Sequence, residues 1–401
     1  MSFCQLPPEQ LRIGHPTPFG LLDAEGRLLM ARGAVIESAA HREQLLERGV
    51  YVDEKETEAY GRAMAGKLDS MLQQNELLGR IAQAQPDTAV VDAASPTRRH
   101  ADPLAALSDL QMHAGKLLRE APGSDFKAHL CKVHDELFGL LDGDPDTALL
   151  LLINATTSEV REYSATHAML VAVVCDLASR HLADWPVERC EPLRCAALTM
   201  NMAMTALQDT LALQTTPPTA QQRAQIDSHA ERAVQGLEAA GIDDALWIEA
   251  VRQHHNALPG PLAELPPAMQ LARLIQRADI FAARLSPRRQ RAALSGTDAA
   301  RAAYLDERKQ ADEAGAAIVK ATGIYPPGSF VRLVDGEVAV VLRRGRRANE
   351  PWVASVLGRT GMPLGEPALR NTQLARHAVS AGVAPQDVRL RLNLPRLLRL
   401  L

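Results

Sequence analysis

Four histidines and one aspartate stand out as side chains that could bind a metal ion. The histidines are His167, His229 and the adjacent pair His254-His255, and the carboxylate is Asp279. Imidazole nitrogens and a carboxylate oxygen together suit first-row divalent ions such as iron, manganese, nickel or zinc. A lone histidine in a helix is usually a hydrogen-bonded polar residue. The adjacent pair, with two further histidines and an aspartate elsewhere, favours a joint site.

These five residues are far apart in the sequence, so helices must bring them together. Over residues 104–322, apolar residues recur at three- and four-residue spacings, which is typical of amphipathic helices. Breaks at Pro122-Gly123, Pro186, Pro217-Pro218 and Pro259-Gly-Pro261 divide the stretch into about eight helices, which predicts a helical bundle. The metal site would therefore exist only in the folded bundle.

The segments on either side of the bundle have other patterns. Residues 1–53 combine a hairpin signal, a helix over 39–48 and a strand at 50–52, which predicts a small α+β N-terminal module. Residues 54–103 predict a connecting polar helix and a Pro/Ala-rich linker. Residues 323–401 begin with two alternating runs around Asp335-Gly336, and residues 352–357 could add a third strand. The predicted fold is mainly α, with a C-terminal β-hairpin and basic extension.

Several short segments, in their order along the chain, resemble the HD-GYP domain family. The likeness covers residues of about 130–345 and is most specific in the run from Gly323 to Val341. It implies an HD-type helical bundle that binds two or three metal ions and hydrolyses cyclic di-GMP, a bacterial second messenger. The first 53 residues also resemble the small domain that often precedes this bundle. The other matching segments are Tyr163-Ser-x-x-His167, Ala196-Ala-Leu-Thr199, Ile226-Asp-Ser-His229, Val251-Arg-Gln-His-His255 and Ala278-Asp279.

The resemblance fails first at the family's namesake His-Asp pair. Met200 and Asn201 stand at those two positions, and Met204 stands where the family has a lysine that reaches phosphate. A thioether is a soft ligand that does not suit hard divalent ions, and a neutral amide cannot offset the charge of two adjacent dications. We therefore expect fewer than two metal ions per chain.

A second difference follows the paired histidines, where the family has a glutamate and a Gly-Tyr-Pro loop. Here the chain continues Asn256-Ala-Leu-Pro-Gly-Pro-Leu262. The five retained positions, His167, His229, His254, His255 and Asp279, could bind one divalent metal such as iron, manganese or another first-row ion. Alternatively, no metal binds, and the five are inherited residues that form hydrogen bonds inside the bundle.

Three arginines follow Asp279 at a point where the resemblance implies phosphate contacts. They are Arg288, Arg289 and Arg291, and the planar guanidinium group matches phosphate oxygens. A cluster of this kind is more often solvated at a helix start. Both interpretations stay open.

The positive charge of the chain is concentrated near its C-terminus. The formal net charge is −4, yet the chain from Val340 onwards carries eleven arginines against three acidic residues. This segment could bind phosphate, nucleic acid or an acidic partner, or it could pair with the acidic body of the same chain, which we favour. We do not favour nucleic-acid binding, because the arginine runs lack interleaved aromatic residues.

Composition excludes several classes of protein. With 46% hydrophobic and 23% charged residues, the chain is not a disordered one. The five cysteines form no C-x-x-C pair, so we expect reduced thiols rather than disulfides or a thiolate zinc site. The longest apolar run, residues 168–175, is far shorter than the roughly 20 residues of a membrane span. We expect a cytoplasmic protein without membrane contact.

These observations lead to two hypotheses about function. The favoured one is a cyclic di-GMP signalling protein of the HD-GYP type that is catalytically impaired and binds a ligand or partner. Its ligand would be cyclic di-GMP or another nucleotide, and its partner a protein or a second copy of the chain. The alternative is an active metal-dependent cyclic di-GMP phosphodiesterase with an atypical ligand set, because one metal with an open coordination position can activate water.

Overall fold

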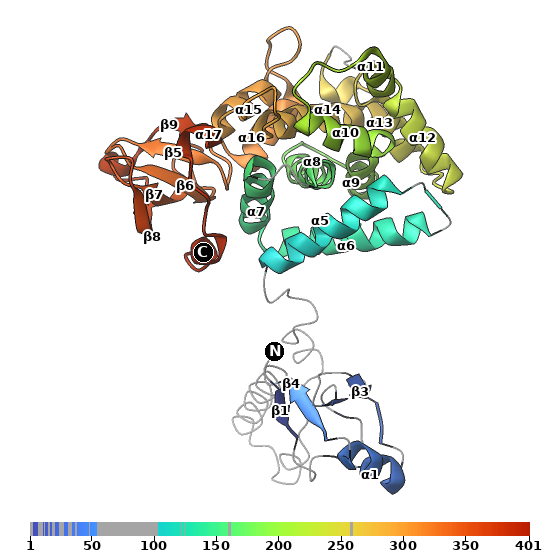
Figure 1. Cartoon of the computed structure of the whole chain (residues 1–401). Helices are drawn as coiled ribbons and strands as arrows, with labels where there is room; N and C mark the ends of the chain where they lie inside the picture. Colours follow the sequence, from blue (N-terminus) through green and yellow to red (C-terminus); the bar gives the residue numbers. More distant parts are fainter. Residues whose placement is uncertain are drawn as a thin grey trace. The chain divides into compact units, whose positions relative to one another are not determined.

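The computed structural model contains two compact units, Met1–Asp102 and Pro103–Leu401 (Figure 1). In the second unit it describes all residues except 121, 124, 159–161 and 257–259. In the first unit it describes 3–6, 11, 13–14, 17, 21–23, 28–30, 34–36, 38–47 and 49–53. The connecting helix and linker predicted over 54–103 lie outside the described residues, except for Pro103, which is the first residue of a helix rather than the end of the linker. Among the described residues, no helix is long and apolar enough to cross a membrane.

The N-terminal unit contains a small antiparallel sheet and one helix, as its sequence pattern predicts. Strands β2 and β3 form the expected hairpin, and the strand order is β1-β4-β2-β3. Leu21, Ile36 and Val52 form the centre of its core and are fully buried. The elements are β1 (Phe3–Gln5), β2 (Leu21–Leu22), β3 (Leu28–Met30), α1 (Ala39–Glu47) and β4 (Tyr51–Asp53).

The larger unit begins with a helical bundle, which confirms the mainly α fold. Between Pro103 and Thr322, the described residues form twelve α-helices rather than about eight. The extra helices arise where the chain breaks without a proline signal, as at Ser228 between α11 and α12. The helices are α5 (Pro103–Arg119), α6 (Phe126–Gly143), α7 (Pro145–Ser158), α8 (Tyr163–Ser179), α9 (Cys190–Thr199), α10 (Thr205–Leu213), α11 (Ala220–Asp227), α12 (His229–Ala239), α13 (Ala245–Gln253), α14 (Pro267–Leu285), α15 (Gly296–Tyr304) and α16 (Glu313–Thr322).

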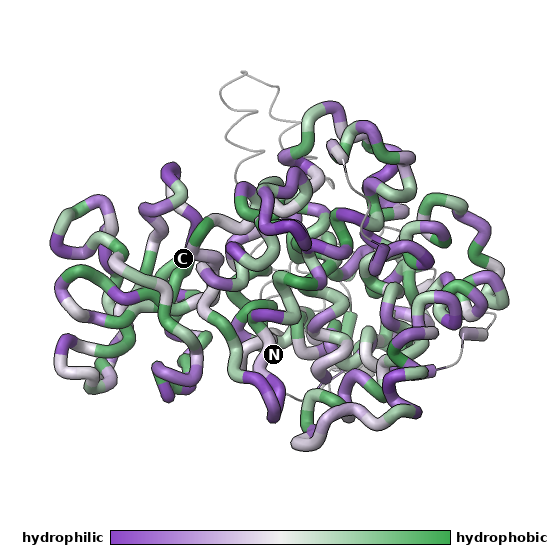
Figure 2. The backbone as a smooth tube through the Cα atoms, turned by 90° about the horizontal axis from the view of Figure 1, so that it is seen from above, coloured by the Kyte–Doolittle hydropathy of each residue, from purple (hydrophilic) through white to green (hydrophobic). Residues whose placement is uncertain are grey.

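Helix α8 lies at the centre of the bundle (Figure 1). Every one of its residues is buried, and it contacts α7, α9, α14 and α16. A helix that is apolar around its whole circumference must be enclosed by others, and the sequence Ala-Met-Leu-Val-Ala-Val-Val meets that condition. Figure 2 shows long hydrophobic stretches within the helical region and hydrophilic residues on its outer loops. Polar residues on α8, including His167, are therefore held in a rigid core.

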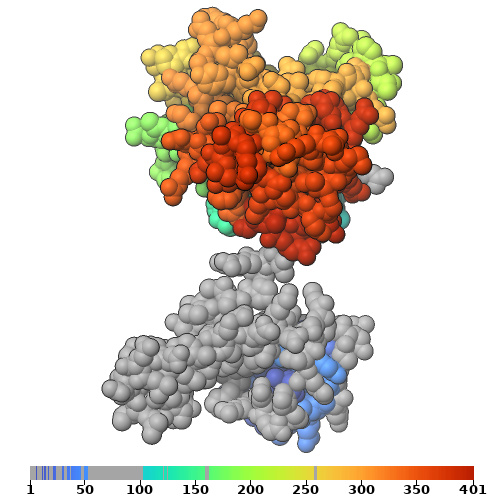
Figure 3. All heavy atoms as spheres, turned by 90° about the vertical axis from the view of Figure 1, so that its left-hand side faces the viewer, coloured from blue at the N-terminus to red at the C-terminus, as the bar shows by residue number. Residues whose placement is uncertain are grey.

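The C-terminal extension is larger than the predicted hairpin. The hairpin of β5 (Phe330–Leu333) and β6 (Val338–Arg343) is present, and β7 (Trp352–Leu357) is the third strand. Strands β8 (Pro363–Asn371) and β9 (Val379–Val383) complete an antiparallel sheet of order β8-β7-β6-β5-β9. Two short helices, α17 (Pro385–Val388) and α18 (Leu394–Leu398), follow the sheet. Figure 3 shows that the extension covers one face of this unit.

The sheet packs against the helices through one of its two faces. Phe330, Val340 and Ala354 are aligned across three strands and belong to the same core as the bundle. Val331 and Ala339, which point to the opposite face, belong to a separate small core. Helix α7 contacts β6 and α15 contacts β9. The bundle and the sheet therefore form one body.

Several arginines of the extension pair with acidic residues of the same chain. Arg343 Nη2 lies 2.8 Å from Asp144 Oδ2, and Arg344 Nε lies 2.5 Å from Asp146 Oδ1. Asp146 lies in the first turn of α7, and Asp144 directly precedes that helix. These ion pairs agree with the favoured interpretation of the arginine-rich end as one that pairs with the acidic body of the chain.

Candidate metal centre

Three of the five predicted ligand residues converge at one point between α12 and α13. His229 is the first residue of α12, and His254 and His255 follow the end of α13. The Nε2 atom of His229 lies 3.2 Å from Nε2 of His254 and 3.2 Å from Nε2 of His255. One nitrogen from each of the three rings lies within 4.8 Å of the other two.

The orientation of two of these rings is fixed by the backbone. Nδ1 of His229 bonds the carbonyl oxygen of Ile226, and Nδ1 of His254 lies 2.6 Å from that of Val251. A carbonyl oxygen only accepts hydrogen bonds, so each Nδ1 carries the proton and each Nε2 of a neutral ring presents a lone pair. Metal-binding histidines are commonly held in this way by a bond to the other ring nitrogen.

The separation of the facing nitrogens fits a shared cation. Two lone pairs at 3.2 Å repel each other unless a proton or a metal ion lies between them. Two nitrogens each about 2.1 Å from one metal, with an angle of 90–109° between the bonds, are about 3.0–3.4 Å apart. Two of the three nitrogen separations in this cluster therefore lie in the range expected for two ligands of one divalent ion.

Burial keeps two of these imidazoles in the neutral form that binds metal. His229 and His254 are each 1% exposed. Burial, together with the charge of His255, lowers the pKa of His254 to about 3. Burial also lowers the pKa of His229. Because a neutral imidazole needs no deprotonation before it binds a metal, the centre is ready for a cation at neutral pH.

His167 and Asp279 form a second pair beside the three histidines. Nε2 of His167 on α8 lies 2.7 Å from Oδ1 of Asp279 on α14. Burial raises the pKa of Asp279, but the hydrogen bond with His167 and the charges of His167, His254 and His255 outweigh it and bring that pKa to about 2. Burial lowers the pKa of His229 and of His254, and the Asp279 charge offsets only part of that lowering. The carboxylate thus supplies negative charge next to the centre.

The two residues that the sequence analysis places at the family's His-Asp positions are both buried. Met200 is fully buried in the hydrophobic core. Asn201 is 8% exposed, and its Oδ1 has no hydrogen-bond partner among the described residues. The next segment, the 3-10 helix η4 (Met202–Met204), contacts α12, which begins at His229.

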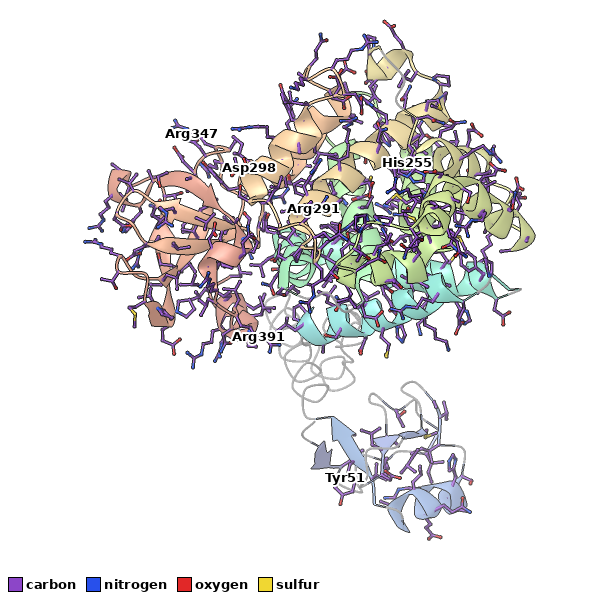
Figure 4. All side chains as sticks on the ribbon, turned by 45° about the horizontal axis from the view of Figure 1, so that its top comes forward. Tyr51, His255, Arg291, Asp298, Arg347 and Arg391 are labelled. Atoms are coloured by element: carbon purple, nitrogen blue, oxygen red, sulfur yellow. The ribbon has the colours of Figure 1, made fainter. Side chains whose placement is uncertain are left out.

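The three predicted phosphate-binding arginines have different environments. Arg288 donates from Nε and Nη2 to the hydroxyl oxygen of Tyr163, at 3.2 and 3.0 Å. Arg291 bonds the carbonyl oxygen of Ala283, and burial and the neighbouring Arg288 lower its pKa (Figure 4). The side chain of Arg289 is exposed. Arg288 and Arg291 therefore contact the protein itself, whereas Arg289 faces solvent.

Tyr163 contacts His167, although the sequence analysis named it only as part of the segment Tyr163-Ser-x-x-His167 and gave it no role in the site. Its ring stacks on that of His167, with centroids 5.9 Å apart and an interplanar angle of 10°. The signal was the four-residue spacing between the two, which places them on one face of α8. Through Tyr163, Arg288 is connected to His167.

Comparisons with known proteins give little further information. No family model matches the chain, and no curated protein matches it. Among solved structures, the chain is similar to Bd1817, a HDG"Y"P protein from Bdellovibrio bacteriovorus. The identity is 13%, the TM-score is 0.42, and the match covers 80% of this chain and 99% of that chain.

Proposed function

We propose that the helical bundle is a signalling module of the HD-GYP type that binds one divalent first-row metal ion and does not hydrolyse cyclic di-GMP. The observation that carries this proposal is the convergence of three Nε2 atoms, with those of His254 and His255 each 3.2 Å from that of His229. His229, His254 and His255 are the proposed ligands. The order of motifs along the chain, from His167 to the Gly323 segment, supports the HD-GYP type.

The residues around the metal have distinct proposed roles. Asp279 offsets the charge of the metal and holds His167 through the 2.7 Å hydrogen bond. Tyr163 and Arg288 fix the position of the His167 ring. A bound divalent ion would supply Lewis acidity toward a phosphate oxygen. With Met200 and Asn201 in place of a ligand pair, the chain has no bridging carboxylate for a second ion.

The proposed ligand is an anionic nucleotide, either cyclic di-GMP or a related molecule. His255 is the exposed member of the three histidines, so an outside ligand could reach the centre from its side. Arg289 is the arginine best placed to contact phosphate, because its side chain is exposed, whereas Arg288 already donates to Tyr163 and Arg291 to the Ala283 carbonyl oxygen. The resulting signal would pass to a protein partner or to a second copy of the chain.

One observation favours the alternative of an active phosphodiesterase. Three histidine ligands leave coordination positions open, and catalytic metal sites characteristically keep such a position for water. Hydrolysis would then depend on the same three side chains.

A cobalt titration combined with a hydrolysis assay tests the proposal and separates it from the alternative. Co²⁺ should give visible absorption bands with the full chain and with His113→Ala, a matched change at a histidine that is 43% exposed. The bands should be lost with His254→Ala. Cyclic di-GMP should bind the metal-loaded protein and remain uncleaved. A linear dinucleotide product that disappears with His254→Ala would establish the phosphodiesterase instead.

A further inference from the structure

A cavity of about 960 Å³ lies between the helices and the C-terminal extension. Its walls come from the end of α7, from residues 287–293 and from the segment that joins α17 to α18. Pockets that enclose small molecules have volumes of roughly 300–1,000 Å³. None of the five candidate ligand residues lines this cavity. It is therefore a separate place from the metal centre.

Two arginines line the cavity without an acidic partner. Arg389 and Arg391 are exposed, and neither forms an ion pair with any residue that the structure describes. They alternate with Leu390 and Leu392, which pack against the hydrophobic core. All four residues line the cavity, so the segment that carries the two arginines is anchored at its wall. The two guanidinium groups are available to an anion there.

A buried amide in the same cavity also has no partner. Asn154 on α7 is 9% exposed and lines the cavity. Its backbone oxygen accepts from Thr157 and Ser158, at 3.1 and 2.6 Å, but its side-chain amide bonds to none of the described residues. The amide atoms are not sealed from the cavity, so they are open to a ligand there. A ligand with both donor and acceptor atoms would satisfy this amide.

The remaining walls are largely apolar. Phe330, Pro287, Leu392 and Leu394 contribute hydrocarbon surface next to these polar groups. A ligand that fits must combine an anionic end, a hydrogen-bonding edge and an apolar body. We propose that this cavity binds an organic phosphate of mononucleotide size, with its phosphate on Arg389 and Arg391 and its ring edge on the Asn154 amide.

The cavity and the three histidines of the metal centre have no residue in common. Figure 4 places Arg391 beside the C-terminal extension and His255 among the helices. One lining residue, Pro287, directly precedes Arg288, which bonds Tyr163. Binding in the cavity does not require metal, so this proposal stands even if the proposed function fails.

Isothermal titration calorimetry of the full chain tests the proposal. The probes are AMP, GMP, CMP and UMP, each titrated separately, with adenosine and inorganic phosphate as fragments. At least one mononucleotide should bind, and its two fragments should bind about tenfold more weakly or worse. The affinity should be the same in His254→Ala, which separates the cavity from the metal centre.

Matched variants locate the binding. Arg389→Gln with Arg391→Gln should weaken binding by at least about tenfold, and Asn154→Leu should also weaken it. The control, Arg346→Gln with Arg376→Gln, removes two exposed arginines of the same extension that do not line the cavity. It should change the affinity less than about twofold. Equal losses in the two arginine pairs, or no mononucleotide binding at millimolar concentration, would overturn the proposal.

Discussion

His167 Nε2 lies 2.7 Å from Asp279 Oδ1, and this contact joins the central helix α8 to α14. His167 is 2% exposed, and its other ring nitrogen has no partner among the described residues. Among the described residues, the carboxylate is therefore the hydrogen-bond partner of one nitrogen of this buried ring.

Removing that carboxylate should destabilise the bundle. Asp279→Ala leaves the His167 ring buried without a partner, which costs about 1–3 kcal/mol in the free energy of unfolding. Asp279→Asn keeps an oxygen acceptor and should lose less than half of that amount. Urea unfolding in the presence of a chelator measures both variants without a contribution from metal. Equal losses for the two variants would contradict this role.

The hydroxyl group of Tyr163 should be coupled energetically to Arg288. Tyr163→Phe removes an acceptor that receives two hydrogen bonds and should lower the free energy of unfolding by about 1 kcal/mol. In a double-mutant cycle, Arg288→Met should cost little more once Tyr163 is already Phe. Additive losses would show that the two side chains do not interact.

Stability should fall in acid because of a half-buried ion pair in the C-terminal sheet. Hydrogen bonds from Arg370 and Ser355 lower the pKa of Glu337 from 4.5 to about 2, and the side chain is 12% exposed. Because the folded-state pKa is the lower one, this stability is complete above about pH 4.5 and is lost as the pH falls toward 2. Glu337→Gln and Arg370→Gln should each flatten the dependence of unfolding free energy on pH over that range. A slope unchanged in both variants would exclude this pair as its source.

Introducing the His-Asp pair of the HD-GYP family should add a second metal ion before it adds activity. Met200→His with Asn201→Asp would return a carboxylate that can bridge two ions, so the metal content should rise. Met204 and residues 256–262 still differ from the family pattern, so hydrolysis of cyclic di-GMP should stay near background. Metal analysis and nucleotide chromatography of the same preparation provide the two readouts. Full hydrolysis by the double variant would show that the His-Asp pair alone limits catalysis.

Much of the fold follows from apolar periodicity. The all-round apolar sequence of α8 predicts a buried helix, and the Asp335-Gly336 turn predicts the β5–β6 hairpin. Strand β8 escaped prediction because Pro363–Asn371 carries two prolines and few β-branched residues. Its antiparallel pairing with β7, rather than the strand propensity of its own residues, places this segment in the sheet. The number of helices was wrong because the chain bends at Ser228 and around η4 without a proline.

The candidate site was predictable only in part. The adjacency of His254 and His255 drew attention to the metal site, and the structure places His229 beside both. The backbone oxygens of Ile226 and Val251 bond the Nδ1 atoms of His229 and His254. These bonds depend on local helix geometry, so they could not be predicted from residue types. The cavity at Arg389 and Arg391 is formed by segments more than 200 residues apart, and no linear pattern could reveal it.

Elemental analysis of the full chain, purified without chelator, tests the central claim most directly. One equivalent of a first-row divalent metal is expected per chain, with His254→Ala near zero and His113→Ala unchanged. If His254→Ala loses the metal and His113→Ala keeps it, the three converging Nε2 atoms are its ligands. Two equivalents per chain, or one equivalent that His254→Ala retains, would contradict the account.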